Sequence, residues 1–321
     1  MNLTRLEKDT HLLAKKRFGQ NFLHDRNMID KIVRSIAPKE MDTIVEIGPG
    51  RGAITFPLLT SGCQLEAVEI DKDLIPGLYE TCPLPEKFHL HNADALTFDF
   101  SVIAAQFRLV GNLPYNISTP LLFHLMNFTS QISDIHVMLQ REVVDRIVAK
   151  PHNKTYGRLS VMLQYYCDVE RLFLIPPGVF DPVPKIDSAL LRLIPKKNRP
   201  LNFNQEKYLE ELVKLAFGQR RKTLRNNLKT IISTEQWASM SIDSQQRAEN
   251  LSVEDFVRLT RLLAESVSVE EVGGGSERRT GVYTPVHEDL STEPTNKFST
   301  EIGLCKKSTK EIEKNGNLCN W

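Results

Sequence analysis

Short apolar runs alternate with amphipathic stretches between residues 20 and 195. Runs with the length of buried strands lie within TIVEIGPGRGAIT, QLEAVEIDKDL, KFHLHNADAL, FRLVGNLPY and DIHVMLQ, and the first of them spans Thr43 to Ile47. Two further apolar, β-rich pieces, in VERLFLIPPGVFDPVP and SALLRLIP, border a proline-rich loop. Strands that alternate with helical stretches predict an α/β protein with a mostly parallel, doubly wound sheet.

Helical periodicity precedes the first of these strands. Asp25 is a suitable N-cap, and the following apolar residues recur at the spacing of one helix face. These residues are Met28, Ile29, Ile32, Val33 and Ile36.

The pattern changes after residue 194, and residues 204–264 contain no convincing strand. One predicted helix face carries Tyr208, Leu209, Leu212, Val213 and Ala216, and another carries Leu224, Leu228 and Ile231. Ser252 and Asp255 resemble a capping box ahead of a third helix. We therefore expect a first domain over residues 1–196, a small helical domain over 197–265 and a disordered tail over 266–321, where Gly, Ser, Thr, Glu and Pro prevail.

The composition is ordinary for a globular protein, with 41% hydrophobic and 25% charged residues. The five cysteines are scattered and no Cys/His cluster stands out, so neither a disulfide framework nor a zinc site is predicted. No apolar stretch reaches the length of a membrane span or a signal core, which favours the cytoplasm. The net charge of +1 conceals the segment GQRRKTLRNNLK, which has no acidic residue. A nucleic-acid partner is therefore compatible with the total charge.

The turn after the first predicted strand has the pattern G-x-G-x-G at Gly48, Gly50 and Gly52. Glycines let a backbone approach a ligand, and open α/β sheets bind ligands beyond the carboxyl ends of their strands; a merely tight turn is the alternative. Glu69 ends the second predicted strand, where a carboxylate can accept both ribose hydroxyls of NAD or of S-adenosylmethionine. Asp94 follows the third strand and either accepts from an adenine amino group or caps the next helix.

The stretch LVGNLPYNIST closes the fourth predicted strand. The Asn112 side-chain oxygen and the Leu113 carbonyl can accept the two hydrogens of an exocyclic adenine amine, which makes its nitrogen more nucleophilic. Pro114 restricts the backbone there, and Tyr115 offers a face on which an unstacked base can lie. An ordinary strand-to-helix turn with a buried tyrosine is the alternative interpretation.

Taken together, the motifs resemble the ribosomal RNA adenine N6,N6-dimethyltransferases, and among them the bacterial small-subunit type. The matching segments fall between residues 14 and 264 and are KKRFGQNFL, VEIGPGRGAIT, AVEID, NADAL, VGNLPYNISTPLLF, LQREVVDRI, GRLSVMLQ, VFDPVPKIDSALLRL and FGQRRKTLRNNL. The resemblance implies a Rossmann-like class I methyltransferase domain followed by a helical RNA-binding domain. It further implies S-adenosylmethionine as cofactor and dimethylation of two adjacent adenosines in a hairpin near the 3′ end of small-subunit (16S) rRNA, within a pre-30S particle. We expect a monomer without metal.

The resemblance also assigns roles to individual residues. Asn21 and Leu23 would close over the cofactor, Gly48 would line it, Glu69 would hold its ribose and Asp94 its adenine, and Asn112 would lie between cofactor and target amine. Phe180 would cover the target base opposite Tyr115, because an unstacked base needs two walls. The residues expected to contact RNA are Lys15, Lys16, Arg17, Arg220, Arg221, Lys222 and Arg225.

Three other functions share some of these features. A large-subunit rRNA adenine methyltransferase of the antibiotic-resistance type would use the same kind of loops for its cofactor and its target base. The segments NLPYNIS and FGQRRKTLRNNL favour the small-subunit type. A ribosome-assembly factor that keeps the fold without activity would not need Glu69, Asp94 and Asn112 together. An NAD dehydrogenase explains neither NLPY nor the basic segment.

Overall fold

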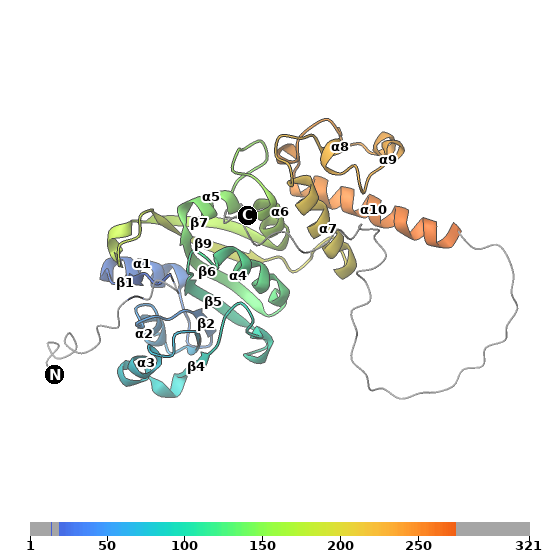
Figure 1. The fold of residues 1–321 in the computed structure, drawn as a ribbon. Coiled ribbons are helices and arrows are strands. Elements are labelled where there is room, and N and C mark those ends of the chain that lie inside the picture. The colour runs from blue at the N-terminus through green and yellow to red at the C-terminus, as the bar shows by residue number, and fades with distance from the viewer. Residues whose placement is uncertain (1–13, 15–18, 274–321) are drawn as a thin grey trace, which may run out of the picture. The chain divides into compact units, whose positions relative to one another are not determined.

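A seven-stranded sheet organises the chain in the computed structural model, which describes residue 14 and residues 19–273 (Figure 1). The strand order is β4-β3-β2-β5-β6-β9-β7, with parallel pairing from β4 to β6 and antiparallel pairing of β9 with both of its neighbours. The strands are β2 (Thr43–Ile47), β3 (Gln64–Glu69), β4 (Phe88–Asn92), β5 (Phe107–Asn112), β6 (Ile132–Gln140), β7 (Cys167–Ile175) and β9 (Ser188–Pro195). The predicted, mostly parallel α/β sheet is confirmed.

Helices cover both faces of the sheet, because alternate residues of each strand point to opposite faces. One face packs on α4 (Ser118–Leu125), α5 (Arg141–Ile147) and α6 (Arg158–Tyr166), and Val45 and Leu109 belong to that core. The other face packs on α1 (Arg26–Ile36), α2 (Thr55–Leu59) and α3 (Ile75–Thr81), and Ile44 and Val110 belong to that core. Short 3-10 turns are η3 (Pro85–Lys87), η4 (Phe100–Val102), η5 (Met126–Phe128), η6 (Pro177–Val179) and η7 (Ala248–Asn250).

Asp25 caps α1 as predicted. Its Oδ1 accepts a hydrogen bond of 2.7 Å from the Met28 N–H, which satisfies one of the orphan donors of the first turn. Ile29, Ile32 and Ile36 are buried on the inner face of the helix.

Arg108 joins the far end of α1 to the sheet. Its Nη2 donates to the Ile36 carbonyl at 2.6 Å and its Nη1 to the Ala37 carbonyl at 3.2 Å. The same guanidinium pairs with Asp42 at 2.8 Å and with Asp134 at 2.9 Å. A single side chain on β5 therefore ties together a helix end, the loop before β2 and strand β6.

The helical part of the chain comprises α7 (Phe203–Ala216), α8 (Leu224–Asn227), α9 (Thr234–Ser239) and α10 (Val253–Gly273). The capping box is confirmed, since Ser252 and Asp255 exchange hydrogen bonds of 3.0 and 3.1 Å between backbone N–H and side-chain oxygen. The core of this part extends onto α6 through Val161 and Met162.

Three details of the helical prediction are wrong. Leu224, Leu228 and Ile231 do not share one helix face, because α8 ends at Asn227 and Ile231 lies in the turn that follows. Tyr208 was expected on the buried face of α7 but is 43% exposed, because the apolar stripe of that helix is narrow and is filled by Leu209, Leu212, Val213 and Ala216. The tail was expected from residue 266, whereas α10 continues through residue 273. The rest of the tail lies outside the described residues, as do the predicted RNA contacts Lys15, Lys16 and Arg17. Among the helices that are described, none has the length and apolar character of a membrane span.

Candidate active site

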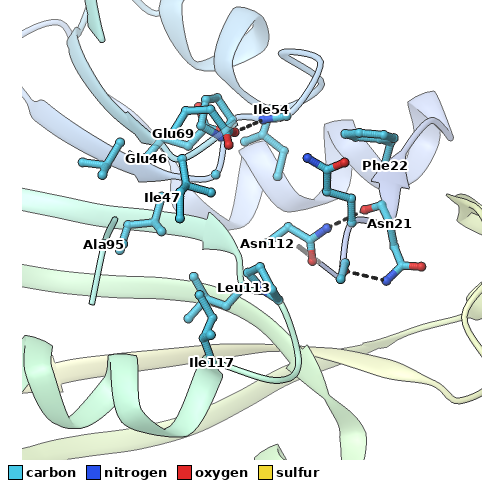
Figure 2. A pocket seen from close by; sticks show the side chains of 18 of the residues that line it. Asn21, Phe22, Glu46, Ile47, Ile54, Glu69, Ala95, Asn112, Leu113 and Ile117 are labelled. Carbon is cyan, nitrogen blue, oxygen red and sulfur yellow. Dashed lines mark hydrogen bonds between the residues drawn. The ribbon is translucent and has the colours of Figure 1, made fainter. Parts of the chain in front are cut away.

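A cavity of about 310 Å³ opens at the carboxyl ends of β2, β3 and β5 (Figure 2). The loops that follow these strands form its floor, and residues 19–23 pass across it. Every residue predicted to touch a cofactor lines this cavity, namely Asn21, Leu23, Gly48, Glu69, Asp94 and Asn112. Parallel strands bring residues distant in sequence to one edge of the sheet, where this class of fold binds ligands.

The loop after β2 contains glycines with positive φ, a backbone conformation that other residues rarely adopt. Gly48 and Gly50 have φ values of +67° and +59°. A Cβ on Gly50 would lie 3.2 Å from the Phe22 ring, so glycine is also needed for the close approach of the segment above the loop. A Cβ on Gly48 would meet only the Asn112 carbonyl, at 4.0 Å, and the space beside it is open for a ligand.

Glu69 is buried at the end of β3 and is oriented by the backbone. Its Oε1 accepts the Asp71 N–H at 2.8 Å and its Oε2 accepts the Gly50 N–H at 3.3 Å. Burial raises the pKa of Glu69, and these two N–H groups oppose the rise. Each carboxylate oxygen can accept a further hydrogen bond, so the group suits a diol such as a ribose.

Asp94 caps the turn that follows β4 and also borders the cavity. Its Oδ1 accepts the Leu96 N–H at 2.9 Å and so caps the following turn. Its side chain also lines the cavity. The cap fixes the carboxylate while the second oxygen can still accept from a ligand.

Asn112 points its amide across the cavity mouth toward residues 19–23. Its Nδ2 donates to the Asn21 carbonyl at 2.9 Å, as Figure 2 shows. This bond fixes the amide orientation and leaves Oδ1 as an acceptor. The Leu113 carbonyl accepts no hydrogen bond from any residue that the structure describes. Two adjacent acceptors are therefore available to an amine.

Tyr115 is held beside these acceptors. Its hydroxyl lies 2.8 Å from the Ser188 Oγ, and the Ser118 hydroxyl donates to the Tyr115 carbonyl at 3.2 Å. The ring is half-buried and lines the cavity with Pro114. A fixed, partly exposed ring is a suitable platform for a base.

Phe180 does not join the other predicted residues. It lies in β8 (Phe180–Asp181), which pairs with β1 (Phe22–Leu23), and its side chain is 1% exposed within the core. It is not among the residues that line the cavity. In this conformation it offers no ring face opposite Tyr115, although it supports Leu23, its partner across the ribbon.

Sequence reasoning missed the contacts that hold residues 19–23 in place. The Gln20 Nε2 donates to Asp71 at 3.0 Å, and Asp71 is buried. The Arg51 guanidinium lies 4.2 Å above the Phe22 ring and 3.9 Å from Asp181. These pairs are far apart in the chain, and no local pattern signals them.

Glu46 is the second buried carboxylate of the site. It is 2% exposed, lines the cavity, and its Oε2 has no hydrogen-bond partner among the described residues. Burial raises the pKa of Glu46 to about 7; the neighbouring Thr55 hydroxyl opposes the rise and the Glu69 charge adds to it. The sequence showed Glu46 at the strand end, but its burial was not predictable.

This pKa gives a stability prediction for the Glu46→Gln variant without ligand. The folded state holds the Glu46 proton up to about pH 7, whereas the unfolded chain releases it at the ordinary value of 4.5, so wild-type stability falls as the pH rises through this window. Glutamine carries no charge at any pH. The variant should therefore be more stable than the wild type at pH 8 by up to about 3 kcal/mol, with little difference at pH 5.

Urea denaturation at the two pH values measures this difference. The exposed Glu86→Gln serves as control and should show no such pH dependence. A Glu46→Gln protein that is less stable than the wild type at pH 8 would show that the ionised carboxylate is satisfied in the fold.

The four described basic residues of GQRRKTLRNNL are exposed between α7 and α8 and on α8 itself. Arg220 pairs with Glu249 at 3.1 Å, and Arg225 donates to the Thr234 hydroxyl at 3.2 Å. In the part of the chain described, Arg221 and Lys222 form no ion pair. Exposed cations without an acidic partner are suited to phosphates.

Comparison with families of known proteins matches residues 11–265 to the family Ribosomal RNA adenine dimethylase. The curated protein Ribosomal RNA small subunit methyltransferase A of Pseudomonas syringae pv. tomato is 52% identical over 260 residues, which cover 80% of this chain and 97% of that protein. The protein of the same name from Saccharophagus degradans is 53% identical over 253 residues, covering 78% and 94%.

Solved structures agree with the fold. A dimethyladenosine transferase from Plasmodium falciparum superposes with a TM-score of 0.63 at 26% identity, covering 77% of this chain and 98% of that one. The 23S rRNA methyltransferase ErmE superposes with a TM-score of 0.62 at 24% identity, covering 76% and 100%, a level at which the likeness concerns the fold alone.

Proposed function

This chain belongs to the ribosomal RNA adenine dimethylase family, and we propose that it dimethylates the N6 amino groups of two adjacent adenosines in a hairpin near the 3′ end of small-subunit (16S) rRNA, using S-adenosylmethionine. The observation that carries this proposal is the pair of acceptors at Asn112 and Leu113, beside Tyr115 and at the mouth of a nucleoside-sized cavity. An amine is the group that such acceptors recognise.

The cavity fits S-adenosylmethionine by its donor and acceptor set. Glu69 would hold the ribose hydroxyls, Asp94 would meet the adenine amino group, and Gly48, which has open space beside it, would line the cofactor. Asn21 and Leu23 would cover the cofactor from above. When bound, the cofactor supplies an electrophilic methyl group on a sulfonium.

The residues of the acceptor pair prepare the target nitrogen. Hydrogen bonds from the adenine amine to Asn112 Oδ1 and the Leu113 carbonyl would favour a pyramidal nitrogen whose lone pair is less delocalised into the ring. Tyr115 would hold the base by stacking, which is worth about 1–3 kcal/mol per base. The acceptor pair would hold this nitrogen ready for the methyl group that the cofactor supplies, and the proton that the nitrogen loses would pass to water. Positioning is the main contribution of the protein.

Other surfaces of the chain would recognise the pre-30S particle. Arg220, Arg221, Lys222 and Arg225 would contact rRNA phosphates, together with Lys15, Lys16 and Arg17. Residues 197–265 would act as an RNA-binding domain beside the methyltransferase domain. Phe180 would form the second wall around the base only if the β1–β8 ribbon shifts when RNA binds. We expect a monomer that acts on a pre-30S particle in the cytoplasm.

A methylation assay with two substrates tests the proposal. The protein is incubated with tritiated S-adenosylmethionine and either under-methylated small subunits or large-subunit rRNA, and the labelled nucleotides are mapped. We expect label on two adjacent adenosines near the 3′ end of 16S rRNA and none on the large-subunit rRNA. Label in large-subunit rRNA would favour the antibiotic-resistance type, and label in neither would favour an assembly factor without activity.

A further inference from the structure

Three side chains with metal-binding atoms meet on the outer two strands of the sheet, away from the residues assigned above. Glu66 on β3 lies opposite His89 on β4 in the parallel register. His89 and His91 are two residues apart on one strand, so both point to the same face. The carboxylate of Glu66 belongs to that face too, since its Oε2 lies 2.8 Å from the His91 Nε2.

The geometry of this Glu66–His89–His91 cluster is close to that of a metal site. One ligating atom from each residue lies within 4.8 Å of the other two, and the two imidazole rings are 4.7 Å apart. Ligands of a tetrahedral zinc ion at about 2.1 Å are separated from one another by about 3.4 Å. The His89 side chain is exposed, so its rotation can bring a ring nitrogen closer to the other two ligands.

We infer that this cluster binds one divalent transition-metal ion of the zinc type, with water completing the coordination. Two imidazoles and one carboxylate form a donor set that suits zinc and its neighbours, whereas magnesium and calcium prefer oxygen alone. The site is accessible, because the side chains of His91 and Glu66 are 23% and 25% exposed. The Phe98 ring, 5.0 Å from that of His91, limits the movement of one ligand.

A metal ion bound here would link β3 to β4 at the edge of the sheet. Among the described strands of the sheet, β4 is the outermost and pairs only with β3. The same two strands end at Glu69 and lead to Asp94, so an ion three residues upstream would fix the backbone that positions both carboxylates. No zinc site was predicted, because Glu66 stands 25 residues before His91 in the chain and strand pairing brings them together.

Zinc binding to the full chain tests the inference. Isothermal titration with ZnCl2 and the melting temperature with and without Zn²⁺ are measured for the wild type, for His89→Ala and Glu66→Gln, and for His152→Asn as a matched control. His152 is exposed in a loop between α5 and α6 and has φ +67°, which asparagine tolerates.

We expect one Zn²⁺ whose affinity falls at least about tenfold in His89→Ala and Glu66→Gln but not in His152→Asn. Zn²⁺ should raise the melting temperature of the wild type and the control by several degrees, and that of the two site variants by much less. His89 is exposed, so its loss leaves the fold intact. If zinc does not bind the wild type, or binds both site variants as tightly, the cluster is only a hydrogen-bonded histidine–glutamate pair.

Discussion

Replacing Asn112 by alanine should lower the rate of methyl transfer at least about a thousandfold and change the dissociation constant of S-adenosylmethionine by less than about tenfold. The variant loses the Oδ1 acceptor proposed for the target amine, while Glu69 at the end of β3 and Asp94 after β4 would still hold the nucleoside of the cofactor. Because positioning and polarisation of the amine supply most of the proposed rate enhancement, the loss falls on the chemical step.

Single-turnover methylation of small subunits and calorimetric binding of the cofactor separate the two quantities. Asn127→Ala is a matched control, since Asn127 is an exposed asparagine in η5. Loss of cofactor affinity by much more than tenfold would place Asn112 in the binding of the cofactor, and an unchanged rate would exclude it from the transfer.

Replacing Arg108 by alanine should lower the free energy of unfolding by about 3–5 kcal/mol. The change leaves the carboxylates of Asp42 and Asp134 without their shared cation and removes the donors for the Ile36 and Ala37 carbonyls. These groups are mostly buried, with side-chain exposures of 14% for Arg108, 19% for Asp42 and 22% for Asp134, so water replaces the lost bonds only in part.

Urea denaturation at pH 7 measures the effect of Arg108. Lys214→Ala is the control, because its pair with Glu211 is exposed on both sides and should contribute less than about 0.5 kcal/mol. A loss below about 1 kcal/mol in Arg108→Ala would show that the end of α1 is held by apolar packing alone.

The strands and their chemistry were predictable because local patterns set them. The apolar run from Thr43 to Ile47 stops before Gly48, and β2 also ends at Ile47. Glu69 and Asn112 close their strands, and parallel pairing then brings them to one edge of the sheet. The positions of residues that end parallel strands therefore follow from the sequence.

Contacts between distant segments could not be predicted in the same way. Strand β9 lies between β6 and β7 although it follows both in the chain, and no residue pattern specifies that order. The burial of Phe180 and of Asp71 depends on the β1–β8 ribbon and on Gln20, which is 51 residues before Asp71. The amino-acid composition of these strands and loops is consistent with several strand orders and several sets of long-range contacts.

The hydrogen bond from Asn112 to the Asn21 carbonyl makes the proposed reaction conditional on closure of the cavity. A primary amide presents a donor on one side and an acceptor on the other, and only the bond to Asn21 decides which side faces the amine. If residues 19–23 lift away, the amide is free to rotate and present its NH2 to the amine, donor against donor. Residues 19–23, which would cover the cofactor, would thus also determine whether Asn112 presents its oxygen or its NH2 to the target amine. With these residues lifted, the cavity would be open to water and the enzyme would be inactive.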